Sequence, residues 1–205
     1  MVFKINKVLY VKANPKTQGT SRTLKVSDSF VKAYKELHPN DETISLDLYK
    51  EDLRFLQEED INSLHKEELL QDKDHPSFKY AHQLLEIDKI IIAAPFWNLS
   101  FPAILKTYLD SVIVGGITFK YTAEGPKGQC HGKKAIHFVT RGGAYSEEPL
   151  SAYELGDRYL RTVFAFVGIT DFTTFALENM DRSHTNVEKV IEDAIKDSYE
   201  LAKEF

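Results

Sequence analysis

Cysteine is almost absent from this 205-residue chain, and the single residue Cys130 excludes an intramolecular disulfide and a thiolate cluster. Long apolar runs are also lacking, since no stretch approaches the roughly 20 residues that a membrane-spanning helix needs. Positive charge is not in excess, because 26 Lys and Arg face 31 Asp and Glu, for a formal net charge of −5. We therefore expect neither a membrane nor a nucleic acid as partner.

Several motifs for catalysis or binding are missing as well. Without GxGxxG a dinucleotide-binding Rossmann site is disfavoured, and without GKT or GKS so is a P-loop. The absence of GxSxG argues against a serine hydrolase. The seven His include no HxxxH or HExxH pair, so we predict no metal site. His137 is then expected to be an ordinary hydrogen-bonded strand residue, and Cys130 an ordinary thiol.

The length and the N-terminus set two further expectations. A chain of 205 residues favours one domain, residues 1–205. The segment from Met1 to Lys7 lacks the apolar core of a signal peptide, which predicts a cytoplasmic protein. Aromatic residues are comparatively frequent, with 13 Phe and 10 Tyr, and these rings must pack in a core, an interface or a ligand site.

Strand and helix patterns alternate along the chain. Short apolar or alternating segments predict five strands, and apolar residues at helical spacing predict the helices between them, one of them capped by Ser21. The predicted strands are 7–12, 43–48, 89–94, 134–140 and 171–176, and the predicted helices are 21–37, 60–70, 78–86, 102–114, 150–167 and 186–204. Residues 117–122 are expected to form an edge strand or extended arm, 123–132 a loop, and 49–77 a rim or lid.

This alternation predicts an α/β fold with a five-stranded parallel sheet and helices on both of its faces. With five strands the favoured arrangement is flavodoxin-like, order 2-1-3-4-5, whose topological switch point lies between strands one and three. The loops after strands one, three and four then meet at the carboxyl edge of the sheet, where such folds bind ligands.

One of these loops suits a phosphate, and another suits a close contact between a ligand and the backbone. The loop from Asn14 to Arg22 is rich in hydroxyl and amide groups and opens a helix, whose N-terminal N–H groups bind phosphate well. The loop from Thr140 to Gly143 contains two glycines, which let the backbone approach a ligand closely. A capped helix with a polar loop, and a tight turn after a strand, are the structural alternatives.

The third loop, residues 94–102, suits a flat heteroaromatic ligand. Phe96 and Trp97 can wall a ring, and the amide of Asn98 can both donate hydrogen bonds to it and accept them from it. The alternative is a packed loop whose aromatic side chains join the core. Together the three loops predict a phosphate seat, a ring wall and a backbone clamp, which is the layout for FMN on a flavodoxin-like sheet.

The same segments resemble a known family, the FMN-dependent NADH:quinone oxidoreductases known as azoreductases. The motifs that carry this resemblance occur in order at 7–12, 21–24, 94–98, 102, 105–110, 116–122, 125–126, 132–135, 140–143 and 168–171. The resemblance implies a flavodoxin-like FMN-binding domain and a homodimer with its FMN sites at the interface. It also implies ping-pong transfer of two electrons from NADH or NADPH to quinones and azo compounds.

The resemblance further implies which residues bind FMN, while the flavin carries the chemistry and no catalytic side chain is required. The implied cofactor-binding residues are Asn14, Gly19, Thr20, Ser21, Pro95, Phe96, Trp97, Asn98, Leu99, Thr140, Arg141, Gly142 and Gly143. Phe119, Tyr121 and Phe166 are expected to line the substrate pocket or the dimer interface, with core packing as the alternative for Phe166. The departures from the family pattern are at Asn14, Gly19, Phe96, Trp97 and Thr140.

Two other functions fit much of the same pattern. One is a non-catalytic electron carrier of flavodoxin type, and the other is a nucleotide-binding regulatory domain without a redox role. The aromatic segment 113–121 and the apolar helix after Leu150 favour an enclosed pocket and a buried dimer interface, and thereby the enzyme.

Overall fold

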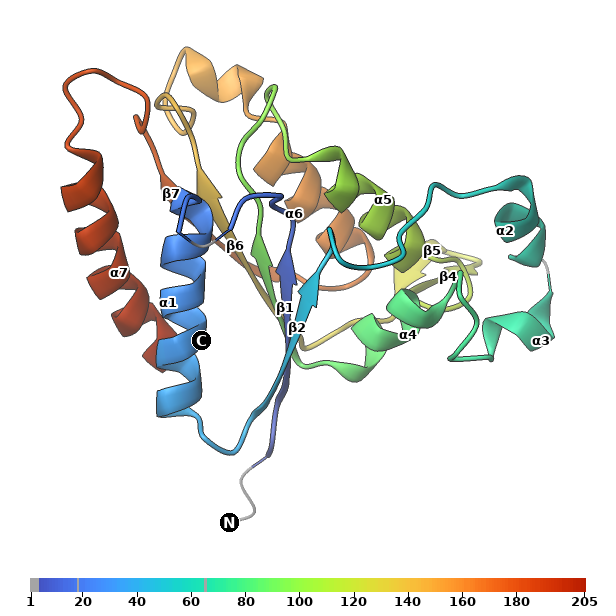
Figure 1. The fold of residues 1–205 in the computed structure, drawn as a ribbon. Helices are drawn as coiled ribbons and strands as arrows, with labels where there is room; N and C mark the ends of the chain where they lie inside the picture. Colours follow the sequence, from blue (N-terminus) through green and yellow to red (C-terminus); the bar gives the residue numbers. More distant parts are fainter. Residues whose placement is uncertain (1–3, 18, 65) are drawn as a thin grey trace.

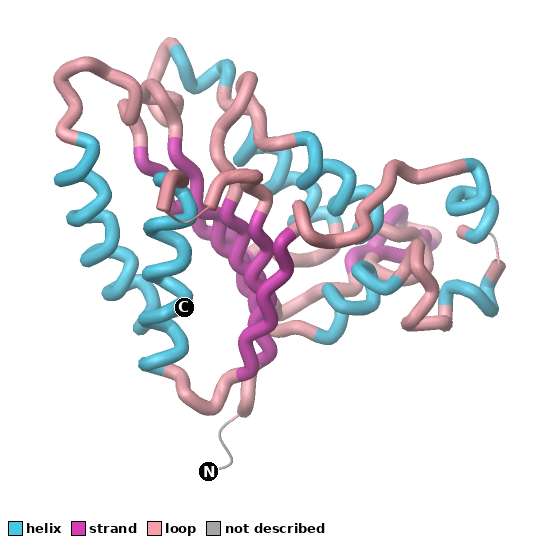
Figure 2. Tube along the Cα trace, viewed as in Figure 1, coloured by secondary structure: helices cyan, strands magenta, loops and turns pink. Residues whose placement is uncertain are grey.

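A central parallel sheet lies between two layers of helices in the computed structural model of the chain (Figure 1), which describes residues 4–17, 19–64 and 66–205. Its strands are β1 (Lys7–Lys12), β2 (Glu42–Asp47), β3 (Lys89–Ala93), β6 (Lys134–Thr140) and β7 (Asp171–Leu177). Figure 2 shows these strands together as one twisted layer. The predicted α/β architecture with five parallel strands is confirmed.

The strands of this sheet pair in the order β2-β1-β3-β6-β7. The central strands β1 and β3 are buried on both faces, which explains why both are continuous apolar runs. A separate antiparallel sheet, formed by β4 (Phe119–Thr122) and β5 (Gly125–Gly128), comes between β3 and β6 in the chain. The labels therefore run 2-1-3-6-7. The sequence analysis numbered only the five strands of the main sheet, so its strands four and five correspond to β6 and β7.

Helices cover both faces of the sheet because side chains alternate along each strand. The helices are α1 (Arg22–Leu37), α2 (Glu58–Ser63), α3 (Glu67–Leu70), α4 (Lys79–Glu86), α5 (Ala103–Val112), the 3-10 turn η1 (Leu150–Tyr153), α6 (Gly156–Phe166) and α7 (Val187–Glu204). On one face α1 and α7 pack over Tyr10 and Phe138, and on the other α4, α5 and α6 pack over Leu9 and Ile92. Among the helices of the described residues, none is long and apolar enough to cross a membrane.

The segment between β2 and α4 contains two short helices, α2 and α3, where a single helix over 60–70 was predicted. After α2 ends at Ser63 the backbone turns, and the N–H of Lys66 donates to the Ser63 carbonyl at 3.1 Å. Leu70 then packs against the small buried cluster that contains Phe78. This tertiary contact overrides the helical periodicity from which the single helix was predicted.

The helix predicted over 150–167 begins only at Gly156, after the separate turn η1. Its start is set by Glu154, whose carboxylate accepts hydrogen bonds from the backbone N–H groups of Asp157 at 2.9 Å and Arg158 at 3.2 Å. A carboxylate that binds first-turn N–H groups stabilises a helix N-terminus. The apolar pattern continues across this cap, so periodicity alone placed the start too early.

The residues predicted as a loop over 123–132 include β5, which pairs with β4 in a hairpin. The sequence of β5 contains two glycines and a proline and none of the β-branched residues that mark strands. Its position depends on packing, because a Cβ at Gly128 would lie 2.2 Å from the carbonyl carbon of Val167. Only glycine lets this strand approach the end of α6 so closely.

Candidate functional site

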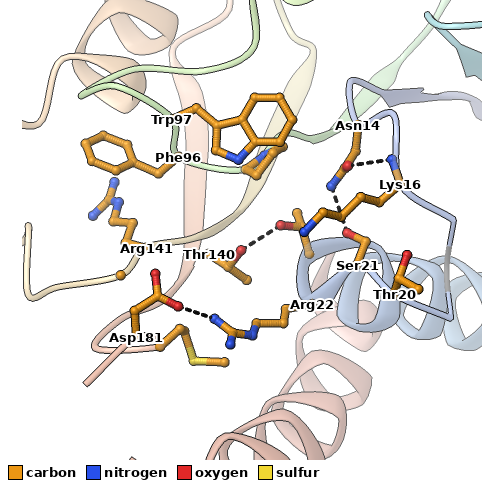
Figure 3. A pocket seen from close by; sticks show the side chains of 14 residues that line it. Asn14, Lys16, Thr20, Ser21, Arg22, Phe96, Trp97, Thr140, Arg141 and Asp181 are labelled. Carbon is orange, nitrogen blue, oxygen red and sulfur yellow. Dashed lines mark hydrogen bonds and ion pairs between the residues drawn. The ribbon is translucent and has the colours of Figure 1, made fainter. Parts of the chain in front are cut away.

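The carboxyl edge of the sheet holds a cavity of 330 Å³, shown from close by in Figure 3. Residues from the loops after β1, β3 and β6 line it, and so do residues from the loop after β7. Nine of the predicted cofactor-binding residues are among them: Asn14, Thr20, Ser21, Pro95, Phe96, Trp97, Thr140, Arg141 and Gly142. The three loops on which the sequence analysis relied therefore meet at one place.

The loop after β1 is organised by hydrogen bonds between its own polar side chains. Asn14 is buried, its amide nitrogen donates to Ser21 Oγ at 2.7 Å, and its amide oxygen accepts from the N–H of Lys16 at 3.0 Å. Ser21 caps α1 as predicted, since its Oγ accepts from the N–H of Leu24 at 3.1 Å. Among the described residues, the exposed hydroxyl of Thr20 makes only long contacts, at 3.3 and 3.4 Å, so it can bond to a ligand instead.

The loop after β3 turns back on itself beside the cavity. The N–H of Trp97 donates to the Ser100 carbonyl at 2.8 Å, and the N–H of Ser100 donates to the Trp97 carbonyl at 3.0 Å. Asn98 and Leu99 at the tip have positive φ angles of 49° and 68°. Tight two-residue turns require this left-handed conformation, which Asn tolerates and Leu does not favour. The turn places the indole of Trp97 beside the cavity (Figure 3).

The loop after β6 is held by Arg141, whose side chain is 3% exposed. Its guanidinium forms ion pairs with Glu178 at 2.9 Å and Glu154 at 3.2 Å, and its charge lies 5.7 Å from the centre of the Phe96 ring. Arg141 is thus engaged with two carboxylates and is not a free cation of the cavity. Gly142 lines the cavity beside it, and a Cβ there would lie 2.6 Å from Asp181 Oδ2.

Five residues outside the predicted cofactor-binding set also line the cavity: Lys16, Arg22, Thr23, Met180 and Asp181. Thr23 and Thr140 are joined by a hydrogen bond of 2.8 Å between their hydroxyls, which links the start of α1 to the end of β6. Arg22 Nη1 donates to Asp181 Oδ1 at 2.7 Å. Met180 and Asp181 could have been predicted from the sequence, because they follow a strand of the same sheet.

Seven predicted residues lie outside the lining of this cavity, as far as the described residues show: Gly19, Asn98, Leu99, Gly143, Phe119, Tyr121 and Phe166. Gly19, Asn98 and Gly143 directly adjoin residues that do line it, and Leu99 follows Asn98 in the same turn. The last three form a separate aromatic cluster, in which the Phe119 ring lies 5.4 Å from Tyr121 and 4.8 Å from Phe166, centre to centre. Tyr121 and Phe166 are exposed, whereas Phe119 is nearly buried.

His137 and Cys130 are buried away from the cavity. His137 Nδ1 lies 3.2 Å from Asp157 Oδ1, which agrees with the prediction of a hydrogen-bonded strand residue. Burial disfavours the Asp157 carboxylate, but hydrogen bonds from His137 and Thr174 outweigh it and lower the pKa of Asp157. Burial raises the pKa of the Cys130 thiol to about 11, so it is protonated at neutral pH. Within residues 4–17, 19–64 and 66–205, no three His, Cys, Asp or Glu are placed to hold a metal ion.

The chain matches known proteins over almost its whole length. A family model described as flavodoxin-like fold matches residues 6–201. FMN-dependent NADH:quinone oxidoreductase 2 of Clostridium acetobutylicum is 58% identical over 201 residues, which cover 98% of this chain and 100% of the relative. The FMN-dependent NADH:quinone oxidoreductase of Caldicellulosiruptor saccharolyticus is 50% identical over 199 residues, covering 97% and 99%.

Solved structures also resemble the chain over almost its whole length. The azoreductase from Bacillus anthracis str. Sterne superposes with a TM-score of 0.89 at 36% identity, covering 98% of this chain and 100% of the other. An FMN-dependent NADH-azoreductase from Bacillus anthracis str. Ames Ancestor, solved in complex with FMN, superposes with a TM-score of 0.87 at 26% identity, covering 98% and 99%.

Proposed function

The chain belongs to the family of FMN-dependent NADH:quinone oxidoreductases, and we propose that it passes two electrons from NADH to quinones and azo compounds by a ping-pong mechanism. The observation that carries this proposal is the 58% identity to such an enzyme over 98% of the chain. The cavity supports it, because loops that are distant in the sequence meet there around polar groups on one side and aromatic rings on the other.

The groups around the cavity fit the chemistry of FMN. A phosphate suits the Thr20 hydroxyl and the first-turn N–H groups of α1, because helix N-termini bind anions. A flat ring suits the side of the cavity formed by Phe96 and Trp97. Gly142 lines the cavity and has no side chain. The edge of a ring can therefore come close to the backbone there and accept hydrogen bonds from N–H groups.

The bound FMN would supply the hydride chemistry, so the side chains of the site have only to bind and orient. Beyond the groups already named, we assign the backbone N–H of Gly143 and the Asn98 amide to the flavin ring. The backbone of Gly19 joins the phosphate seat, and that of Leu99 joins the ring wall. NADH and the acceptor use the same open side of the site in turn, so NAD leaves before the acceptor binds, as in a ping-pong reaction.

The test is reconstitution of the purified protein with FMN, followed by anaerobic addition of NADH. We expect visible flavin bands to stay with the protein through gel filtration, NADH to bleach them, and a quinone or an azo dye to restore them. Parallel turnover assays with NADPH establish the donor preference. A protein that retains no flavin contradicts the proposal. A retained flavin that NADH does not bleach favours the rival function, a flavodoxin-type electron carrier.

We propose further that the enzyme is a cytoplasmic homodimer of one-domain subunits, residues 1–205, with its FMN sites at the interface. The support is a set of apolar side chains exposed along α6 and just before it, Leu155, Tyr159 and Phe166, together with exposed Tyr121, which packs with Phe166 against Phe119. Aromatic side chains exposed together on one surface are typical of contacts with another protein. A second copy placed there would bring the Phe119, Tyr121 and Phe166 cluster close to an acceptor bound by its partner.

A further inference from the structure

Arg22 and Asp181 face each other across one side of the cavity, as Figure 3 shows. Arg22 Nη1 donates to Asp181 Oδ1 at 2.7 Å, and the two residues are 159 positions apart in the sequence. Arg22 is the first residue of α1, and Asp181 lies in the loop after β7. Both line the cavity together with Thr20 and Ser21, the proposed phosphate seat.

The position of Arg22 is electrostatically unfavourable without an anion beside it. The N-terminal end of a helix carries partial positive charge, which attracts anions and repels cations. The first turn of α1, all of which the structure describes, contains no acidic side chain. The carboxylate of Asp181 therefore supplies the negative charge that both the helix end and Arg22 attract.

The contact between the two side chains can open easily. Asp181 is 71% exposed and Arg22 39% exposed, and exposed ion pairs add little to stability. The backbone of Asp181 is the fixed part, because its N–H donates to the Gly142 carbonyl at 3.2 Å. The carboxylate therefore stays beside the cavity when it releases Arg22.

We propose that Arg22 binds the phosphate of FMN, and that Asp181 is a competing anion that holds Arg22 in the free protein. This inference rests on the proposed function, because it concerns the cofactor assigned there. Arg binds phosphate through charge-assisted hydrogen bonds, so the phosphate displaces the carboxylate from the guanidinium. Asp181 then remains close to the phosphate as a like charge and weakens the binding of FMN. The pair thereby sets the affinity for FMN.

The experiment compares FMN with riboflavin, which has the same ring system and no phosphate, by fluorescence titration of the flavin-free protein. We expect Arg22→Gln to weaken FMN binding about tenfold and riboflavin binding less than twofold. Arg22→Lys keeps the charge and is expected to stay within about threefold of the wild type for FMN. Asp181→Asn is expected to tighten FMN binding about threefold or more and to leave riboflavin binding unchanged.

The matched control is Arg182→Gln, which removes an exposed cation next to Asp181 that does not line the cavity. We expect it to change the affinity for FMN less than twofold. Equal losses of FMN and riboflavin affinity in Arg22→Gln, or unchanged or weaker FMN binding in Asp181→Asn, would overturn the inference alone. A wild-type protein that binds neither flavin would overturn the proposed function and this inference with it.

Discussion

In the turn beside the cavity, two consecutive residues other than glycine adopt the left-handed backbone conformation. Asn98 has a φ of 49° and Leu99 a φ of 68°. The conformation costs little for Asn but about 1 kcal/mol or more for Leu, because its Cβ crowds the following carbonyl oxygen. Strained residues of this kind are frequent at ligand sites. The structure therefore gives residue 98 two separable properties, a backbone conformation and an amide side chain.

Substitutions at Asn98 can separate the two properties. Asn98→Gly keeps the positive φ and removes the amide, and we expect FMN affinity to fall about three- to tenfold, the loss of one hydrogen bond. Asn98→Ala should show this loss together with a stability lower by about 1 kcal/mol, from backbone strain. Fluorescence titration and thermal unfolding measure the two effects.

Leu99→Gly is the control for the turn, because it relieves strain and leaves the amide of Asn98 in place. It also keeps the backbone of Leu99, which is the part assigned to the ring wall, so we expect the wild-type FMN affinity. If Asn98→Gly also binds FMN as the wild type does, the role assigned to the Asn98 amide is wrong.

At the scale of elements, α2 shows how a helix too short to be stable alone is kept in place. Its six residues depend on Asp60, whose Oδ2 accepts from the N–H of Gln57 at 2.8 Å. Asp60 Oδ1 accepts from Arg54 Nη2 at 2.7 Å and also from the hydroxyl of Ser77. Isolated helices of this length do not form in water, so these tertiary contacts supply its stability.

The same contacts predict a dependence on pH. The hydrogen bond from Arg54, with those from Ser77 and the Gln57 N–H, lowers the pKa of Asp60 from 3.8 to about 2. A carboxyl whose pKa is lower in the folded state stabilises the fold above its unfolded pKa and loses this contribution as the pH falls. We expect Asp60→Asn to lower the free energy of unfolding by about 1–2 kcal/mol at pH 7.

Urea unfolding at a series of pH values tests this expectation. The difference between the wild type and Asp60→Asn should shrink as the pH falls from about 4 toward 3. Glu58→Gln removes an exposed carboxylate from the same helix and should have an effect within about 0.5 kcal/mol. A wild-type advantage that stays constant down to pH 3 would show that ionised Asp60 does not stabilise α2.

At the scale of the whole molecule, the helices on the two faces of the sheet expose different sets of aromatic side chains. The outer side of α6 exposes Tyr159 and Phe166, close to β4 and the loop after β3. On the opposite face of the sheet, α7 exposes Tyr199, whose ring lies under Lys203. The α6 side adjoins the turn beside the cavity, because the Leu155 N–H donates to the Leu99 carbonyl at 3.0 Å.

The homodimer proposal can be tested by substitutions that introduce a charge on one or the other of these two surfaces. Phe166 and Tyr199 are matched, with exposed fractions of 40% and 41%. We expect Phe166→Glu to weaken dimerisation roughly a hundredfold or more, because it places a charge in an apolar contact. Tyr199→Glu should leave the dimer intact. Sedimentation velocity at micromolar concentration distinguishes the outcomes, and equal behaviour of both variants would place the interface elsewhere.

Local signals were sufficient for several of the regular elements. The bounds of β1 and β6 agree with the predicted 7–12 and 134–140, because buried parallel strands are continuous apolar runs. The start of α1 after Ser21 was also predictable, since a cap depends on a hydrogen bond to a backbone group three residues away. The meeting of the loops after β1, β3 and β6 followed from a general rule of α/β sheets.

The tertiary structure alone decided the features that depend on contacts between distant residues. Local pattern could not show that Gly128 lets β5 approach Val167, or that Asp181 reaches Arg22 across the cavity. Each arises where chain segments from different elements approach within a few ångströms. Sequence periodicity reports which side of an element is buried, whereas the partner on that side is chosen by packing and charge in three dimensions.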